Sequence, residues 1–545
     1  MSSAPSHAPD RFEALGRASD GRPLPDARRR LAPAVYLSEP VLGWIGPLAI
    51  ALLAGVLRFW RLGYPNALLF DETYYAKDAF SLLRFGYVRD TVDKADELIV
   101  AGRTTGLFTD MASFYVHPDV GKWLIAFGEW LFGLDAFGWR FSAALAGTLT
   151  VLVLARLVRR LTGSTLLGCV AGLLLCLDGL HLVMSRTALL DIFLTLFLVC
   201  AVACLVADRD WGRLRLGRAA PDAPVRPTGF GPLLLWRPWR LAAGVCFGLA
   251  VATKWSALFP LAAFGLLVWA WDSSARRAIG VRLPVLKAAV VDAVPAFFAL
   301  VGVALAVYVS TWAGWLVHAE SYEERLGDDW GSYLRTDADG LGEVAQSVRS
   351  LWNFHQEIWA FHTGDDLRSE THVYESDPWG WLILNRPVGV DAETDIEPGT
   401  QGCPETANTC IRQILAIGTP ALWWGGLLAL LASLWWWIGA RDWRFGLALV
   451  GVASTWLPWL RFSERPIFLF YAVAIIPFTV IATTLALGKI LGPPGRSRRR
   501  LVGACVAGGF VALVAANFAF YYPIWTDGLL THEDWLDRIW FTRWI

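Results

Sequence analysis

The sequence predicts an all-α polytopic membrane protein with about eleven transmembrane helices. Of its 545 residues 55% are hydrophobic and only 18% are charged, and the mean hydropathy is +0.44. A soluble protein of this length needs more charged side chains to cover its surface, so these values indicate a protein whose solvent is the lipid bilayer. The 30 Trp residues agree with this, because the indole ring prefers the membrane–water interface.

Eleven apolar stretches underlie this prediction, since a helix needs roughly 20 apolar residues to cross the hydrocarbon core. They lie at residues 40–56, 141–157, 161–182, 187–206, 241–253, 255–271, 288–315, 414–438, 445–459, 467–487 and 501–521. The fifth and sixth stretches are separated only by the region of Lys254, which makes this boundary the least marked of all.

The basic residues predict the orientation through the positive-inside rule. Clusters of Arg and Lys precede the first stretch and follow the second, fourth, sixth, eighth and tenth, at residues 28–30, 156–160, 209–240, 276–287, 441–444 and 489–500. We therefore expect these loops and the N-terminus in the cytoplasm and the C-terminus outside.

This topology divides the chain into segments. They are a disordered cytoplasmic tail at 1–39, a main transmembrane region at 40–313 that includes a first outer loop at 58–140, a second outer loop at 314–413, further transmembrane helices at 414–521, and a Trp-rich outer tail at 522–545. The tail at 1–39 is not a signal peptide, because the first apolar stretch is too long and begins too late. We expect function in the two outer loops, since loops on a rigid scaffold commonly carry sites.

The first outer loop carries two adjacent acids, Asp71 and Glu72, just beyond the first stretch. The spacing of the apolar residues after Tyr75 predicts a helix that lies on the bilayer and ends at Gly86. A second such helix has Val120, Leu124, Phe127 and Leu131 on one face, with Lys122 and Glu129 elsewhere. The two acids predict either a reactive site beside a lipid substrate or simply the N-cap and first turn of a helix.

Further ionisable residues gather at the outer ends of the predicted spans. They include Arg140, Asp178, His181, Arg186, Asp191, Lys254, Arg461, Glu464 and Arg465. Charged groups at membrane depth usually line a cavity or pathway, although a snorkelling anchor or an ion pair between helices explains any single one of them better. Together with two carboxylates they indicate a site for an anionic headgroup.

Several classes of site receive little support. The formal net charge of zero gives no indication of a nucleic-acid partner. No spacing of Cys or His indicates a structural metal, and the two Asp-x-Asp sequences, at 208–210 and 337–339, lie in a basic loop and in a polar stretch that predicts a solvated turn. Cys403 and Cys410 lie in an outer loop, where a disulfide and two free thiols are both open.

A set of ordered motifs resembles one family. The motifs are Phe70-Asp71-Glu72-x-x-Tyr75, His117-Pro118-x-x-Gly121-Lys122, Trp139-Arg140, Ser185-Arg186-x-x-Leu189-Leu190-Asp191, Thr253-Lys254-Trp255-Ser256, Gly418-Thr419-Pro420 and Tyr522-Pro523-Ile524-Trp525-Thr526. From the first span to the last residue the chain resembles the bacterial, actinobacterial-type protein O-mannosyltransferases of the membrane-embedded GT-C glycosyltransferases. It departs from the family at Asp119, where a second Pro is common, and its second outer loop is too short for the MIR domain of eukaryotic relatives.

The resemblance implies a function. The family transfers mannose with inversion from polyprenyl-phosphate-mannose to Ser or Thr hydroxyls of secreted or membrane proteins. By position Asp71 corresponds to the general base, Glu72 to a positioning residue and Arg140 to a lipid-phosphate contact. Lys254 and Arg465 are weaker candidates for the same phosphate. The remaining site candidates are Tyr75, His117, Lys122, Arg186, Asp191 and His372.

The same resemblance implies the surroundings of the reaction. We expect a multi-pass protein of the plasma membrane whose catalytic region is 40–313 and which needs no cofactor or metal beyond its lipid-linked sugar donor. Its partners are expected to be the donor, acceptor polypeptides, membrane lipids and the secretion translocon, with no nucleic acid.

Two alternatives remain at the level of sequence. A GT-C transferase for another lipid-phosphate sugar, or for a lipid or glycan acceptor, would share the phosphate-handling and proton-transfer residues. A transporter or flippase would use the charged residues to line a translocation path, but such proteins usually show internal repeats, and no repeat is evident in this chain.

Overall fold

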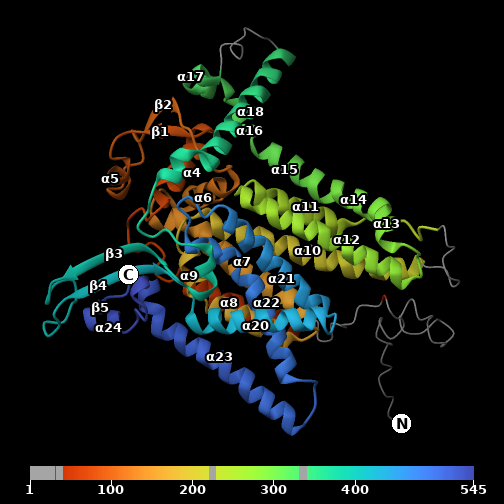
Figure 1. The fold of residues 1–545 in the computed structure, drawn as a ribbon. Coiled ribbons are helices and arrows are strands. Elements are labelled where there is room, and N and C mark those ends of the chain that lie inside the picture. Colours follow the sequence, from red (N-terminus) through yellow and green to blue (C-terminus); the bar gives the residue numbers. More distant parts are fainter. Residues whose placement is uncertain (1–30, 32–40, 220–228, 331–339) are drawn as a thin grey trace, which may run out of the picture.

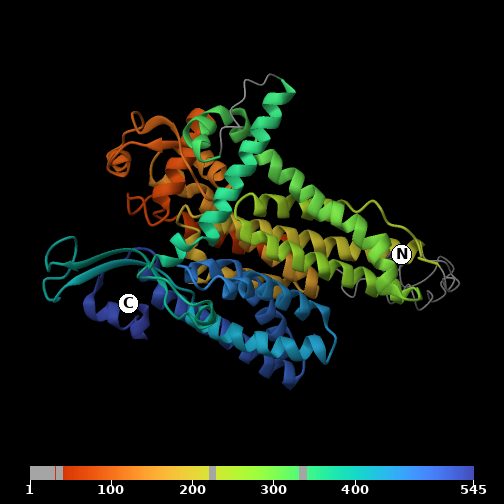
Figure 2. The same cartoon turned by 45° about the horizontal axis from the view of Figure 1, so that its top comes forward.

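The computed structural model describes residue 31 and residues 41–219, 229–330 and 340–545. The expected tail at 1–39 lies outside these residues apart from Leu31, as does the Asp-x-Asp sequence at 337–339. The described chain is mostly helical. Figures 1 and 2 show its long helices running side by side, with two small sheets and the shorter helices gathered at one end.

Each of the eleven predicted stretches overlaps a helix. These are α3 (Leu42–Phe59), α7 (Ala136–Thr162), α8 (Thr165–Cys176), α10 (Leu190–Ala219), α11 (Pro238–Val251), α12 (Leu258–Ala278), the segment Pro284–Thr311 that includes α13 (Pro284–Ala288), α14 (Val294–Phe297) and α15 (Val303–Thr311), then α20 (Pro420–Ile438), α21 (Trp443–Trp456), α22 (Ile476–Leu491) and α23 (Arg498–Trp525). Within the described residues six helical stretches are long and apolar enough to cross a membrane, and four further apolar helices are shorter.

Small residues let the helices approach closely at the centre of the bundle. A Cβ added to Gly168 of α8 would lie 2.7 Å from the backbone oxygen of Ala155 in α7. A Cβ on Gly244 of α11 would lie 2.1 Å from the backbone oxygen of Ala299. Such contacts are typical of helix packing in membranes, where apolar burial alone does not favour association. The most enclosed candidate span is α10.

Three predicted spans were wrong in their details. The stretch 161–182 is broken, because α8 stops at Cys176 and Asp178 caps a separate helix, α9 (Gly179–Met184), through the backbone N–H of His181. The stretch 414–438 begins in a strand, and its helix starts at Pro420, a residue suited to the first helical turn. The stretch 467–487 becomes regular α-helix only at Ile476, after the 3₁₀ segment η7 (Leu469–Ala474).

The all-α prediction also omitted two antiparallel sheets. One pairs β1 (Arg89–Thr91) with β2 (Phe108–Ala112), and the other has the order β3 (Val388–Ile396), β4 (Cys410–Ala416), β5 (Leu530–Thr531). A disulfide joins Cys403 to Cys410, which decides between the two alternatives left by the sequence. Through β5 the C-terminal tail returns to the second outer loop.

The two short helices of the first outer loop are confirmed. They are α4 (Glu72–Phe85), which ends at Gly86 with a φ of 82°, and α6 (Val120–Phe132). On the apolar face expected for α6, Phe127 and Leu131 are exposed, while Lys122 and Glu129, expected elsewhere on the helix, are buried. Gly121 and Gly128 give α6 a narrow face that packs inward, which leaves its large apolar side chains outside.

The second outer loop forms further helices at the same end of the bundle. They are α16 (Ala313–Val317), α17 (Ala319–Trp330), α18 (Leu341–Thr363) and α19 (Asp365–Ser369). In Figure 1 α18 runs from the top of the molecule down toward α4 and α6. The two outer loops therefore meet above the ends of the long helices.

Candidate active site

Asp71 stands at the start of α4 with its side chain unused by the helix. It occupies the N-cap position but makes no capping hydrogen bond. The preceding residue, Phe70, has a φ of 51°, a left-handed conformation that is uncommon for a bulky residue and is found at functional sites. Burial raises the pKa of Asp71 to about 6, a rise that Lys254 opposes and Asp191 increases. A carboxylate with a pKa near 6 suits a general base at neutral pH.

Glu72, the next residue, is fully buried and fully bonded. Its carboxylate accepts hydrogen bonds from Leu69 N (2.9 Å), Trp139 Nε1 (3.3 Å), Arg140 Nε (2.9 Å), Arg140 Nη2 (2.8 Å) and Ala188 N (2.8 Å). These bonds join α4 to α7 and to the segment before α10. Glu72 therefore fixes the start of α4, and with it the position of Asp71.

Arg140 differs from its expected place at a donor phosphate. Its five N–H groups are all engaged, two by Glu72 and the others by the backbone oxygens of Leu62, Pro65 and Ala67. The side chain is only 1% exposed. Arg140 reaches a phosphate only by giving up one of these bonds, so we do not include it in the proposed phosphate site.

Lys254 and Asp191 form a buried ion pair close to Asp71. The Nζ atom of Lys254 lies 3.0 Å and 2.9 Å from the two carboxylate oxygens of Asp191, and 4.1 Å from the ring centroid of Tyr471 in η7. Lys254 is in the gap between α11 and the 3₁₀ turn η1 (Trp255–Ala257). The boundary between the fifth and sixth apolar stretches, which the sequence marks only weakly, is therefore a break in the helix. The break carries the ammonium group to the end of the bundle.

A row of rings connects the first outer loop to Arg465. The ring of His117 lies 6.2 Å from that of Tyr75 and 5.4 Å from that of His362 in α18. Nε2 of His362 donates to the backbone oxygen of Val116, so Nδ1 is free to accept from Nη1 of Arg465 at 3.3 Å. Burial and Arg465 lower the pKa of His362 to about 4, which keeps the imidazole neutral.

Arg465 retains an unused donor. Its Nε atom is buried and has no hydrogen-bond partner among the described residues. A buried donor without a partner is costly unless an acceptor arrives with a ligand. A phosphate oxygen is the acceptor that a guanidinium recognises best.

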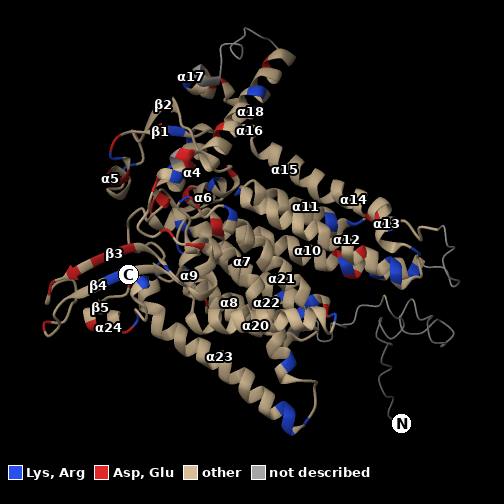
Figure 3. Cartoon of the chain, in the orientation of Figure 1, with Lys and Arg blue, Asp and Glu red and all other residues tan. Residues whose placement is uncertain are grey.

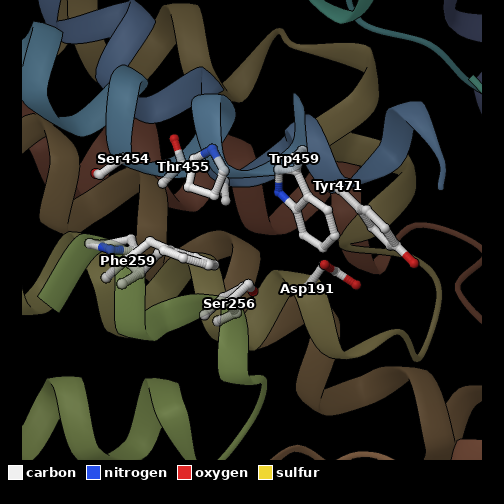
Figure 4. A pocket seen from close by; sticks show the side chains of 12 residues that line it. Asp191, Ser256, Phe259, Ser454, Thr455, Trp459 and Tyr471 are labelled. Atoms are coloured by element: carbon white, nitrogen blue, oxygen red, sulfur yellow. The ribbon is translucent and has the colours of Figure 1, made fainter. Parts of the chain in front are cut away.

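A narrow cleft leads from this cluster along the helices. Its walls come from α10, α12, α21 and η7, and Figure 4 shows Asp191 and Tyr471 at one end with Phe259, Ser454 and Thr455 at the other. Apart from Asp191 and a few hydroxyls the lining is apolar, with Leu194, Leu198 and Trp459 among its residues. The free space between these side chains holds about one water molecule, so a hydrocarbon chain does not fit there unless the helices move apart.

Three of the expected site residues lie outside this cluster or at its edge. Lys122 is buried beside Asp78 (3.0 Å) and Asp119 (3.6 Å), with the ring of Tyr115 at 3.4 Å from its Nζ atom. Arg186 donates to the backbone oxygens of Arg58 (2.9 Å) and Trp60 (2.7 Å) at the end of α3. Both side chains hold elements together.

The third of these residues, His372, packs against Phe70, with their ring centroids 5.9 Å apart. It therefore lies at the edge of the cluster, next to the strained residue that precedes Asp71.

Sequence reasoning missed two members of the cluster, His362 and Tyr471. Each lies more than 100 residues from Asp71 along the chain, and neither belonged to a motif used above. Only the fold brings α18 and η7 to the same place. Among the described residues no group of three or more His, Cys, Asp or Glu side chains is arranged to hold a metal ion.

Comparisons with known proteins decide the family. The model of the dolichyl-phosphate-mannose-protein mannosyltransferase family matches residues 48–322, and that of the C-terminal four-transmembrane region of protein-O-mannosyltransferase matches residues 347–544. This chain belongs to the protein O-mannosyltransferase family. The resemblance seen in the motifs is thereby confirmed.

Relatives within the family match nearly end to end. The chain is 37% identical over 510 residues to a polyprenol-phosphate-mannose–protein mannosyltransferase of Mycobacterium tuberculosis, which covers 92% of both chains. It is 36% identical over 508 residues to one of Mycolicibacterium smegmatis, covering 92% of this chain and 93% of that one.

A solved structure has the same fold. The Saccharomyces cerevisiae protein O-mannosyltransferase Pmt1–Pmt2 complex, bound to the sugar donor, matches with a TM-score of 0.67 at 15% identity, covering 96% of this chain and 95% of that one. This mannosyltransferase therefore has a GT-C fold, as its motifs implied.

Proposed function

We propose that this mannosyltransferase moves mannose from polyprenyl-phosphate-mannose to Ser or Thr hydroxyls of secreted or membrane proteins. The observation that carries the proposal is Asp71, a carboxylate with a pKa of about 6 and no hydrogen bond of its own to the helix. It lies within the electrostatic influence of Lys254, in a chain whose family and relatives carry the name of this reaction.

The proposed step is a single displacement with inversion. The acceptor hydroxyl oxygen attacks C1 of mannose as the bond between C1 and the phosphate oxygen breaks. Asp71 takes the hydroxyl proton, and the electron pair of the broken bond stays on polyprenyl phosphate. Because the hydroxyl is a poor nucleophile before it loses its proton, a base fixed by Glu72 at the start of α4 serves this step directly.

Lys254 and Arg465 are the proposed contacts of the leaving phosphate. Lys254 is buried beside Asp191, and Arg465 has a buried Nε atom without a partner. Charge that develops on the phosphate is stabilised by such fixed cations more than the ground state is.

We also infer eleven membrane crossings with the N-terminus in the cytoplasm and the C-terminus outside. In support, Figure 3 shows Lys and Arg concentrated where α10, α12 and α23 have their ends away from the sheets, while acids are prominent at the opposite end near α4 and β3. The positive-inside rule assigns the basic end to the cytoplasm. For a bacterial relative this is the plasma membrane, and the site faces outward.

The acceptor must reach Asp71 from outside. Acceptors that are still unfolded as they leave the secretion translocon offer their Ser and Thr hydroxyls most readily. We therefore infer that the enzyme works beside the translocon, surrounded by membrane lipids. We expect no metal in the reaction, because the monophosphate carries less charge than a nucleotide diphosphate and two basic side chains face it.

A donor comparison tests the proposal. Purified protein is given synthetic mannosyl-, glucosyl- and arabinosyl-phosphopolyprenol with a Thr-rich peptide, and the peptide mass is measured. We expect a mannose adduct and little reaction with the other sugars. Preference for another sugar, or transfer only to a lipid or glycan, would replace the proposal with the corresponding GT-C reaction. Asp110→Asn, which changes an exposed acid of β2, should show the same donor preference as the wild type.

A further inference from the structure

A second cavity lies between α4 and α6, away from the site described above. It has a volume of about 360 Å³ and is lined by Phe80, Leu83, Arg84, Thr104, Glu129 and Trp130, with Gly133 and Leu134 closing one side. This size falls within the roughly 300–1,000 Å³ of small-molecule sites. No residue of the proposed active site lines it.

Glu129 is the buried acid of this cavity. Its side chain is only 3% exposed, and both carboxylate oxygens lack a hydrogen-bond partner among the described residues. Buried carboxyl groups are normally paired, since an unpaired one is costly. Burial raises the pKa of Glu129 well above its usual range. Both oxygens are therefore open to hydrogen-bond donors of a ligand, since the described residues supply none.

The helix that carries Glu129 is held close to α7. A Cβ added to Gly128 would lie 2.3 Å from the backbone oxygen of Gly138, so α6 cannot rotate here without breaking this contact. Glu129 thus cannot turn outward to water by a small movement of its helix.

Arg84 supplies the opposite charge at the rim. It is an exposed residue of α4 that lies over the ring of Phe80, with 5.0 Å from Cζ to the ring centroid. Within the described residues it forms no ion pair. The cavity therefore has a buried acid inside and an available guanidinium at its edge.

The cavity opens beside a surface suited to lipid. On α6 the side chains of Phe127, Trp130, Leu131 and Phe132 are 44–65% exposed. An amphipathic helix with exposed aromatic side chains lies in the interface of a bilayer. The groups nearest to the cavity mouth are then phospholipid headgroups of the outer leaflet.

We propose that this cavity binds the headgroup of a phospholipid that carries a primary ammonium group. The ammonium donates to the two oxygens of Glu129, and the lipid phosphate pairs with Arg84. Phosphatidylethanolamine has three N–H donors for this role. Phosphatidylcholine has none, and phosphatidylglycerol has no cation. The inference is independent of the sugar transferred and of Asp71.

The test measures binding of short-chain phospholipids to delipidated protein in detergent, by native mass spectrometry or calorimetry. The probes are phosphatidylethanolamine, its N-methyl and N,N-dimethyl forms, phosphatidylcholine and phosphatidylglycerol. We expect affinity to fall along the methylation series, with phosphatidylcholine about tenfold weaker than phosphatidylethanolamine. This series needs no variant, so it holds even if a substitution disturbs folding.

Two variants assign the contacts. Glu129→Gln should bind phosphatidylethanolamine and phosphatidylcholine equally, whereas Arg84→Gln should weaken phosphatidylethanolamine and phosphatidylglycerol together. Glu97→Gln and Arg349→Gln, at exposed positions outside the cavity, should change nothing. A flat methylation series in the wild type, or an undiminished preference for phosphatidylethanolamine in Glu129→Gln, would overturn the proposal.

Discussion

Oε2 of Glu72 lies 2.8 Å from Nη2 of Arg140, and neither side chain is more than 1% exposed. The pair joins the start of α4 to α7 directly beside Asp71. Glu72 is therefore saturated with hydrogen bonds, whereas Asp71 makes no capping hydrogen bond to its helix. We therefore assign Glu72 to positioning the start of α4 and Asp71 to the proton transfer.

Breaking the pair should destabilise the protein. Glu72→Gln leaves the Arg140 charge buried without its counter-ion, and we expect a loss of about 3–5 kcal/mol in the free energy of unfolding. Thermal unfolding in detergent measures this. The double variant Glu72→Leu/Arg140→Met should lose less than the sum of the single changes, because it removes both charges. Glu97→Gln, in an exposed pair with Lys94, should change stability by at most about 0.5 kcal/mol. Additive losses would contradict the assignment.

The pKa of Asp71 predicts an acid limb in the rate. A general base works as its carboxylate, which predominates above a pKa of about 6 and is lost below it. We therefore expect kcat/KM to be level above pH 7 and to fall about tenfold per pH unit well below pH 6. The profile is measured with peptide and synthetic donor. The residual activity of Asp71→Asn should lack this limb, and its persistence there would assign the titration to another group.

Arg465 should act on the donor rather than on stability. Arg465→Gln removes the guanidinium, and with it a phosphate contact, but keeps a polar side chain, and we expect transfer to fall about 10²–10³-fold. Arg465→Lys should recover only part, since an ammonium lacks the paired donors of a guanidinium. Arg461→Gln, at an exposed neighbouring position, is the matched control. Equal activity in Arg465→Gln and wild type would remove Arg465 from the phosphate site.

We expect the disulfide of the second outer loop to stabilise the folded protein without affecting mannose transfer. Replacing both Cys403 and Cys410 with Ser should lower stability by about 2 kcal/mol, as expected for a short closed loop. Transfer by the folded fraction should stay unchanged, because the bond lies at the sheet of β3, β4 and β5. A large loss of kcat without loss of stability would contradict this view.

The sequence predicted the helices far better than it predicted side-chain partners. Apolar length and basic clusters located eleven helical regions, and Gly86 ended α4 as expected. The break at Asp178 was missed because an apolar run continues through it, and hydropathy does not register a cap. The strand at Ile414 was missed because its partner lies some twenty residues away.

The candidate site was predicted in part for the same reason. Motifs located Asp71, Lys254 and Asp191, whose charges are local features of the sequence. They could not show that Arg140 is saturated by nearby groups and that Lys122 pairs with Asp78, nor that His362 arrives from the second outer loop. The apolar spacing of α6 also could not show that Glu129 is buried in the protein while Phe127 and Leu131 are exposed.

The most direct measurement is mannose transfer by Asp71→Asn beside wild type and Asp110→Asn, with matched amounts of folded protein and saturating donor. We expect wild-type rates for Asp110→Asn and a fall of about 10²–10⁴-fold in kcat for Asp71→Asn, at unchanged thermal stability. Transfer by Asp71→Asn within a few-fold of wild type would show that Asp71 does not remove the acceptor proton.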